Sequence, residues 1–273
     1  MPRWRSMLRN SRSRIAEQQE QVVSAEVPPR EEEGRGRTFM LIYMLILGLG
    51  ILLFVALAVV AHAVEYSGLD VTIARAIQGI HTPIYGWVLT QVSDFGFSPL
   101  DIITYVAIFA ILATLGLRLE AVLAVASSLL AGAVGAGIRL LIGRMRPSPQ
   151  LVHVAAPLSG YSFPSGHVIQ YTTLFGFTFY VVLIVWRSSL LRNVVLIVLA
   201  TLVILVGPSR VYLGAHWPSD VLGAYLLAGL WLAGTIELHL LLKRRLGKWG
   251  SRPLHRHKQH PPIVRQGSPA KPG

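Results

Sequence analysis

Long apolar stretches dominate the pattern of this 273-residue chain. The first, residues 39–61, carries no charged side chain and exceeds the roughly 20 residues that an α-helix needs to cross a bilayer. Polar turns separate it from five further apolar stretches. These lie at about residues 99–117, 121–143, 168–186, 193–209 and 221–242, of which 193–209 is the shortest. The pattern therefore predicts an all-α membrane protein, a bundle of six transmembrane helices.

Residues 65–98, between the first two stretches, follow a different pattern. Apolar residues recur there at helical spacing with polar residues between them, as in an amphipathic helix. The residues concerned are Ile73, Ile77, Ile80, Ile84 and Val88. We expect one amphipathic helix here that lies on the outer surface of the membrane.

Composition agrees with a membrane protein. Hydrophobic residues make up 53% and charged residues 14% of the chain, whereas soluble domains carry about 25% charged residues. The chain has no cysteine, which excludes disulfides, a thiol nucleophile and thiolate metal sites.

The net charge of +12 is concentrated near the ends of the chain. Residues 243–273 contain nine Lys or Arg and no acid, and short basic turns occur at Arg118 and at residues 187–192. With six spans these segments share one side of the membrane, which the positive-inside rule makes cytosolic. The basic ends favour contact with anionic lipid rather than with nucleic acid, since no base-reading module is present.

This pattern divides the chain into three parts. A polar N-terminal tail, a six-span domain and a basic, Pro-rich C-terminal tail are predicted at residues 1–38, 39–245 and 246–273. Both tails are expected to lie in the cytosol. The domain itself is expected to reside in a plasma membrane, and the compact chain favours a bacterial one.

Three polar clusters stand at the predicted outer ends of the spans. They are "RLLIGRMRP" at residues 139–147, "YSFPSGH" at residues 161–167 and "SRVYLGAHWPSD" at residues 209–220. Ionisable groups at membrane depth are costly and are usually kept for function. The alternatives are purely structural roles: interfacial arginine anchors, a helix-starting turn around Pro164, and a helix cap made by His216 and Asp220.

The residue types in these clusters favour phosphoryl transfer. Guanidinium groups match phosphate oxygens, and a helix start with Ser165 and Gly166 offers free N–H groups to an anion. His216 and Asp220 are four residues apart, so the carboxylate can accept a proton from Nδ1 and leave Nε2 reactive. A second histidine, His167, can supply the complementary acid.

The three clusters, read together, resemble the signature of the type 2 phosphatidic acid phosphatase (PAP2) superfamily. The matching elements are Arg139-x6-Arg146-Pro147, Pro164-Ser165-Gly166-His167 and Ser209-Arg210-x5-His216-x3-Asp220. They agree with the family in order and spacing, and the six-span plan extends the resemblance to about residues 39–242.

This resemblance implies a role for each matching residue. His216 would attack phosphorus, Asp220 would orient it, and His167 would protonate the leaving oxygen. The phosphate oxygens would be held by Arg139, Arg146, Ser165, Gly166 and Arg210. No metal ion and no other cofactor is expected. The family usually has lysine at the position of Arg139, a change that keeps the charge but alters its shape. Arg144 lies off the motif and is interpreted as an interfacial anchor.

The resulting prediction is an integral membrane lipid phosphatase, a metal-independent hydrolase whose site faces outward. Undecaprenyl pyrophosphate is the favoured substrate, and phosphatidylglycerophosphate, phosphatidic acid and diacylglycerol pyrophosphate are alternatives. A lipid-to-lipid phosphotransferase would use the same site. A non-catalytic lipid-phosphate binder or transporter is the hypothesis from another class, and it is disfavoured because His167, His216 and Asp220 are all retained.

Overall fold

The computed structural model describes residues 29–250, and within this range the chain forms eight helices and no strand. In chain order they are α2 (Pro29–Ala63), α3 (Gly68–Gln78), α4 (Pro83–Asp94), α5 (Leu100–Thr114), α6 (Arg118–Ile142), α7 (Gly166–Val185), α8 (Leu190–Tyr212) and α9 (Pro218–Gly250). The predicted all-α fold is thus confirmed for this part. Most of each predicted tail lies outside the described residues, and α2 and α9 extend into the inner part of each.

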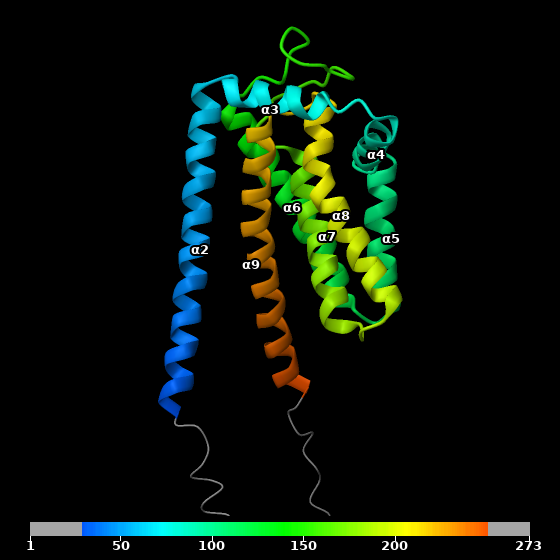
Figure 1. Cartoon of the computed structure of the whole chain (residues 1–273). Coiled ribbons are helices and arrows are strands. Elements are labelled where there is room, and N and C mark those ends of the chain that lie inside the picture. Colours follow the sequence, from blue (N-terminus) through cyan, green and yellow to red (C-terminus); the bar gives the residue numbers. More distant parts are fainter. Residues whose placement is uncertain (1–28, 251–273) are drawn as a thin grey trace, which may run out of the picture.

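Helices α6, α7, α8 and α9 form a bundle in which α7 is central (Figure 1). In the most apolar stretch of each helix, 56% of the residues of α7 are buried, against 6% for α2. Helix α5 packs along α6, and α2 lies along α9 at the edge of the molecule. An almost fully exposed apolar helix such as α2 is stable in lipid, because acyl chains are as apolar as its own side chains.

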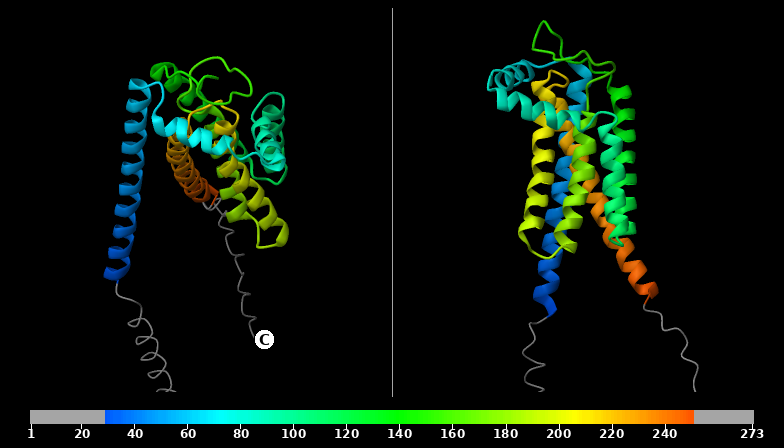
Figure 2. Two further views of the ribbon diagram at one scale, coloured as in Figure 1. Left: turned by 45° about the horizontal axis from the view of Figure 1, so that its top comes forward. Right: turned by 90° about the vertical axis from the view of Figure 1, so that its right-hand side faces the viewer.

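The two ends of the bundle differ in structure. Helices α3 and α4 lie at one end, together with the segments that join α6 to α7 and α8 to α9 (Figures 1 and 2). We call this the site end. Helix α2 begins and α9 ends at the opposite end (Figure 1).

The single amphipathic helix predicted within residues 65–98 is wrong, because this segment forms two helices. Helix α3 ends at Gly79, and α4 begins at Pro83, with Thr82 as its extended N-cap. Proline lacks the N–H that a continuing helix would need and disfavours helical geometry in the residue before it. The five apolar residues therefore do not share one helix face, and Ile84, directly after Pro83, is 77% exposed.

Five of the six predicted spans are helices long and apolar enough to cross a membrane within residues 29–250. The remaining one, predicted at residues 99–117, is the 15-residue helix α5. At 1.5 Å per residue it extends about 22 Å, less than the roughly 30 Å of a hydrocarbon core. Helix α8, predicted as the shortest span, has 23 residues.

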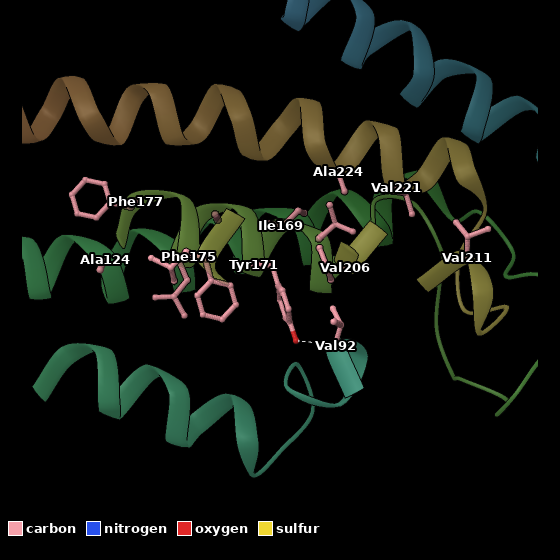
Figure 3. Close-up of a cluster of buried hydrophobic side chains, with 14 of the residues drawn as sticks. Val92, Ala124, Ile169, Tyr171, Phe175, Phe177, Val206, Val211, Val221 and Ala224 are labelled. Carbon is pink, nitrogen blue, oxygen red and sulfur yellow. Dashed lines mark hydrogen bonds between the residues drawn. The ribbon is translucent and has the colours of Figure 1, made fainter. Parts of the chain in front are cut away.

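The core is built around α7. Ile169, Phe175 and Phe177 on α7 are buried against small residues of the neighbouring helices, including Ala124 and Ala224 (Figure 3). The hydroxyl of Tyr171 donates a hydrogen bond of 2.5 Å to the carbonyl of Val92 in α4. This packing holds the start of α7 and the end of α4 at the site end.

Candidate active site

The three polar clusters of the sequence come together at the site end, around a cavity of about 490 Å³. Arg139 lies in the last turn of α6, Arg210 in the last turn of α8 and His167 in the first turn of α7. Arg146 and His216 lie in the segments that follow α6 and α8. All five line the cavity with Gly166, and Ser165, which precedes Gly166, and Asp220 are fully buried.

Local sequence explains how the two arginines of the first cluster reach one cavity. Helix α6 ends at Gly143, which adopts a left-handed conformation (φ 69°) that favours glycine. The chain therefore leaves the helix between Arg139 and Arg146. The Nη1 atom of Arg139 donates to the carbonyl of Pro164 at 3.2 Å, and Nη1 of Arg146 donates to the carbonyl of Ala215 at 2.8 Å.

The ring of His216 is 3% exposed and has a defined environment at each nitrogen. Nε2 lies 3.3 Å from Nη1 of Arg146, and Nδ1 lies 3.4 Å from Oγ of Ser162. Since the guanidinium can only donate, Nε2 is the accepting nitrogen and Nδ1 carries the proton. Burial lowers the pKa of His216 to about 4, although Asp220 opposes the shift. The neutral ring thus presents its lone pair toward the cavity at neutral pH.

The direct hydrogen bond expected between His216 and Asp220 is absent from the described site. Nδ1 of His216 and Oδ2 of Asp220 are 3.8 Å apart, too far for such a bond. The hydroxyl of Ser162 lies between them and donates to Oδ2 of Asp220. Ser162, a residue that sequence reasoning missed, therefore connects the two. Its place within "YSFPSGH" is the only sequence signal for it.

Asp220 is fully buried, and both of its carboxylate oxygens are engaged. Besides the Ser162 hydroxyl, Oδ2 accepts the backbone N–H of Trp217 at 2.8 Å. Oδ1 accepts from Nη1 of Arg144 at 2.7 Å. Two segments of the chain, the one between α6 and α7 and the one between α8 and α9, therefore hold this carboxylate in one orientation.

The interpretation of Arg144 as an interfacial anchor is wrong. Its side chain is 1% exposed and forms ion pairs with Asp70 at 2.9 Å and with Asp220 at 2.7 Å. Its Nε atom donates to the carbonyl of Glu65 at 3.0 Å. Sequence reasoning missed both Arg144 and Asp70, because they lie 74 positions apart and only the folded chain brings them together.

Arg210 is held from the α4–α5 side of the cavity. Its Nη1 atom donates to the hydroxyl of Ser93, and its guanidinium lies over the ring of Phe97 at 5.2 Å. The side chain is 2% exposed. Arg139 and Arg146 line the same cavity, so three guanidinium groups concentrate positive charge there. This arrangement suits an anionic group with several oxygens.

His167 is fixed by packing. Its ring lies 4.5 Å from that of Phe97 and 6.5 Å from that of Tyr171, measured between ring centroids. A Cβ atom at Gly96 would lie 2.2 Å from Cδ2 of His167, so only glycine fits there. At Gly166 a Cβ would lie 2.9 Å from Nη1 of Arg139, so a side chain there would displace this guanidinium.

Several buried polar atoms of the site have no hydrogen-bond partner among the described residues. They include Oγ of Ser165, Nε2 of His167 and Nε of Arg210. Buried polar groups are almost always paired, so these atoms are available to a ligand. Within residues 29–250, no three His, Cys, Asp or Glu side chains gather as a metal site would require. The free groups therefore fit a phosphate better than a metal ion.

Comparison with known proteins agrees with this chemistry. The sequence profile of the PAP2 superfamily matches residues 120–244. Phosphatidylglycerophosphatase B from Bacillus subtilis (strain 168) is 31% identical over 182 residues, which cover 64% of this chain and 86% of that protein. Phosphatidylglycerophosphatase B from Haemophilus influenzae is 35% identical over 96 residues, 35% of this chain and 39% of that protein.

Solved structures share the fold. The crystal structure of a transmembrane PAP2-type phosphatidylglycerolphosphate phosphatase from Bacillus subtilis superimposes with a TM-score of 0.60 at 25% identity, covering 71% of this chain and 98% of that one. The structure of LpxE from Aquifex aeolicus gives a TM-score of 0.52 at 19% identity, covering 64% and 98%. The second likeness concerns the fold alone.

Proposed function

The chain belongs to the PAP2 superfamily of metal-independent membrane lipid phosphatases, and we propose that it hydrolyses phosphatidylglycerophosphate through a phosphohistidine on His216. The choice of substrate rests on the match to the Bacillus subtilis phosphatidylglycerophosphatase B, which covers 86% of that protein. Undecaprenyl pyrophosphate, favoured from the compactness of the chain, has no comparable support.

Phosphate binding follows from the charges that line the cavity. The guanidinium groups of Arg139, Arg146 and Arg210 would surround the phosphoryl oxygens, and the unpartnered Ser165 hydroxyl would donate to one of them. Such preorganised donors stabilise the charge that gathers on these oxygens in the transition state. A bound dianion also offsets two of the three positive charges that line the cavity with His167.

In the first step the Nε2 lone pair of His216 attacks phosphorus. The N–P bond forms while the P–O bond to the glycerol oxygen breaks, and that oxygen takes the bonding pair and a proton from His167. Phosphatidylglycerol leaves. The phosphorylated ring keeps its Nδ1 proton and is cationic, so the negative charge of Asp220, relayed by Ser162, stabilises it.

In the second step a water molecule attacks the phosphohistidine. His167, now neutral, takes a proton from this water, and the N–P bond breaks with its electron pair returning to His216. Inorganic phosphate leaves, and both histidines regain their starting protonation. His216 therefore acts first as the nucleophile and then as the leaving group, and His167 acts first as the acid and then as the base.

Charge placement supports an outward-facing site. Arg118, the 187–192 turn and Lys243 lie at the opposite end of the bundle, where the positive-inside rule favours the cytosol. The arginines at the site end are exceptions to that rule, and their contacts in and around the cavity supply the reason.

The test is phosphate release by the purified full-length protein from a panel of phosphatidylglycerophosphate, phosphatidic acid, diacylglycerol pyrophosphate and undecaprenyl pyrophosphate. We expect phosphatidylglycerophosphate to give the highest kcat/KM, with activity unchanged in EDTA and inhibited by vanadate. His216→Ala supplies the blank. A higher kcat/KM for another lipid would replace the proposed substrate. Labelled phosphate appearing on a second lipid, rather than in solution, would identify a phosphotransferase.

A further inference from the structure

A chain of three buried charges lies behind His216. It runs from Asp70 in α3 through Arg144, in the segment after α6, to Asp220 in the first turn of α9. Their exposed fractions are 3%, 3% and 0%. Asp220 and Arg144 are joined at 2.7 Å, and Arg144 and Asp70 at 2.9 Å.

We propose that Arg144, held by Asp70, is a positioning residue for the phosphatase reaction, because it fixes the orientation of Asp220 and through it the nucleophile His216. The proposal rests on the roles of His216 and Asp220 given above. It does not depend on which lipid is the substrate. Neither Arg144 nor Asp70 belongs to the three-part signature.

The geometry of the guanidinium group explains why an arginine stands here. Nη1 donates to Asp220 and to the Ser219 hydroxyl, both at 2.7 Å, while Nη2 donates to Asp70 and Nε to a backbone carbonyl. All three nitrogens are used at once. A lysine has a single nitrogen and cannot span two carboxylates in this way.

Asp70 is itself rigidly held. Its Oδ1 accepts from the backbone N–H of Ser219 at 3.0 Å and from the Ser219 hydroxyl at 2.7 Å, and its Oδ2 accepts from Ser67 in the capping box of α3. Although burial raises the pKa of Asp70, these hydrogen bonds and the Arg144 charge outweigh it and leave the pKa below its ordinary value. Asp70 is therefore ionised and joins α3 to the start of α9.

The charges of the chain suit the reaction step. The phosphorylated ring of His216 is cationic and is stabilised by the negative charge of Asp220. Arg144 fixes the orientation of that carboxylate, but its positive charge cancels the negative charge of Asp220. The negative charge of Asp70 in turn offsets the positive charge of Arg144. The three groups together thus carry one negative charge behind the nucleophile. Loss of Arg144 frees the carboxylate to turn, whereas loss of Asp70 leaves the Arg144 charge uncompensated.

A double-mutant cycle tests this role. We expect Arg144→Gln to lower kcat by about 10- to 100-fold, as supporting partners of active-site ligands do. KM should change by less than about 3-fold, because Arg139, Arg146 and Arg210 still hold the phosphate. In the Asp220→Asn background, Arg144→Gln should lower kcat by less than about 3-fold further, since residues that act as a unit are not additive.

Two further variants extend the cycle and keep it informative if Arg144→Gln does not fold. Arg144→Lys keeps the charge but reaches one carboxylate, and should recover part of the lost kcat. Asp70→Asn should lower kcat by a smaller factor than Arg144→Gln, with KM unchanged. Arg75→Gln is the matched control, because Arg75 also lies at the site end and donates to the carbonyl of Leu151 but does not line the cavity.

The outcomes separate this inference from the proposed function. Equal losses from Arg144→Gln in the wild-type and Asp220→Asn backgrounds would show an independent structural role and overturn the inference alone. A rise in KM at constant kcat would make Arg144 a substrate-binding residue instead. Full activity of His216→Ala would overturn the proposed mechanism as well.

Discussion

Two clusters of ionic side chains lie at opposite ends of the bundle, each with buried carboxylates or rings, and they differ in what surrounds them. At the site end, Asp70, Arg144 and Asp220 stand behind the cavity that holds His216. At the opposite end, Oε1 of Glu120 in α6 lies 2.9 Å from Nε2 of His239 and 2.6 Å from Nζ of Lys243, both in α9.

The opposite-end cluster satisfies its own hydrogen bonds. The second ring nitrogen of His239 lies 3.1 Å from the hydroxyl of Tyr180, and the ring packs against Phe177. The wall of the site cavity instead includes buried polar atoms that no described residue pairs, namely Nε2 of His167 and Nε of Arg210. A buried charge alone therefore does not mark a functional site, whereas unpartnered donors beside a cavity do.

The largest expected effect compares the two buried histidines that each lie near a carboxylate. His216→Ala should lower kcat by about 10⁴-fold or more, because it removes the nucleophile. His239→Ala should leave kcat/KM for the same lipid within about 3-fold. Phosphate release by both variants, purified side by side, measures the difference. Loss of turnover in His239→Ala alone would reverse the assignment of the two ends.

Removal of one phosphate-binding cation should have the next largest effect. Arg210→Ala is expected to lower kcat/KM by about 10²- to 10³-fold, the usual loss when one preorganised donor is deleted. Arg192→Ala is the control, because the side chain of Arg192, near the start of α8, donates to the carbonyl of Trp186 at the end of α7, away from the cavity. Steady-state kinetics on one lipid measure both. Equal kinetics for the two variants would exclude Arg210 from the phosphate site.

The opposite-end cluster should contribute to stability rather than to turnover. Glu120→Gln is expected to lower the free energy of unfolding by about 1–3 kcal/mol, because it leaves the buried ring of His239 and the half-exposed Lys243 without their charged acceptor. The value of kcat/KM should not change. Thermal unfolding in detergent, with the exposed Glu237→Gln as control, measures the first effect. A fall in kcat/KM without a fall in stability would contradict this division of roles.

Arg139→Lys should have a smaller effect, because it restores the residue that the family usually has. Lysine keeps the positive charge but loses the fork that donates to the Pro164 carbonyl. We expect kcat/KM to change by less than about 10-fold, in contrast to Arg139→Ala, which should lose about 10²-fold or more. A similar loss in both variants would mean that the fork, and not the charge, is needed.

The smallest expected effect is the response to mild acid. In the proposed mechanism His216 reacts as the neutral ring. Burial lowers its pKa to about 4, so this form persists as the pH falls and is lost only near that value. Between pH 7 and pH 5 the fraction of neutral His216 should fall by only about 10%, whereas an ordinary histidine would become mostly protonated. The pH profile of kcat/KM, corrected for the ionisation of the substrate, measures this. An acid limb near pH 6.5 that remains after this correction would show that His216 is not shielded.

Much of the candidate site was predictable because its residues carry their chemistry in local sequence. Arg139, His167 and His216 were all singled out from the three clusters, and the structure brings them to one cavity. Ser162 escaped notice, although it lies in the same heptapeptide as His167, because a lone serine next to apolar residues has many ordinary roles. The position of Ser162 in the motif was visible in the sequence, but nothing there indicated its chemical role.

The fold was predictable to a similar degree. Apolar length marks a transmembrane helix reliably, so five spans were located from composition alone. The segment before α5 was harder, because helical spacing of apolar residues continues across Pro83 even though the helix does not. The spacing of apolar residues describes one face of a helix. It does not reveal a break in the helix when the apolar residues on both sides keep that spacing in the sequence.

The sequence by itself determined the class of the protein, the family signature and the residue types proposed to bind a phosphate. These depend on apolar length and on short motifs, both of which are local. Tertiary structure alone decided that Arg144 is buried between Asp70 and Asp220, and that Asp220 reaches His216 through Ser162. The reason is physical, because an ion pair forms wherever the fold brings two opposite charges together. Asp70 and Arg144 are far apart along the chain, so no local sequence pattern predicts that they pair.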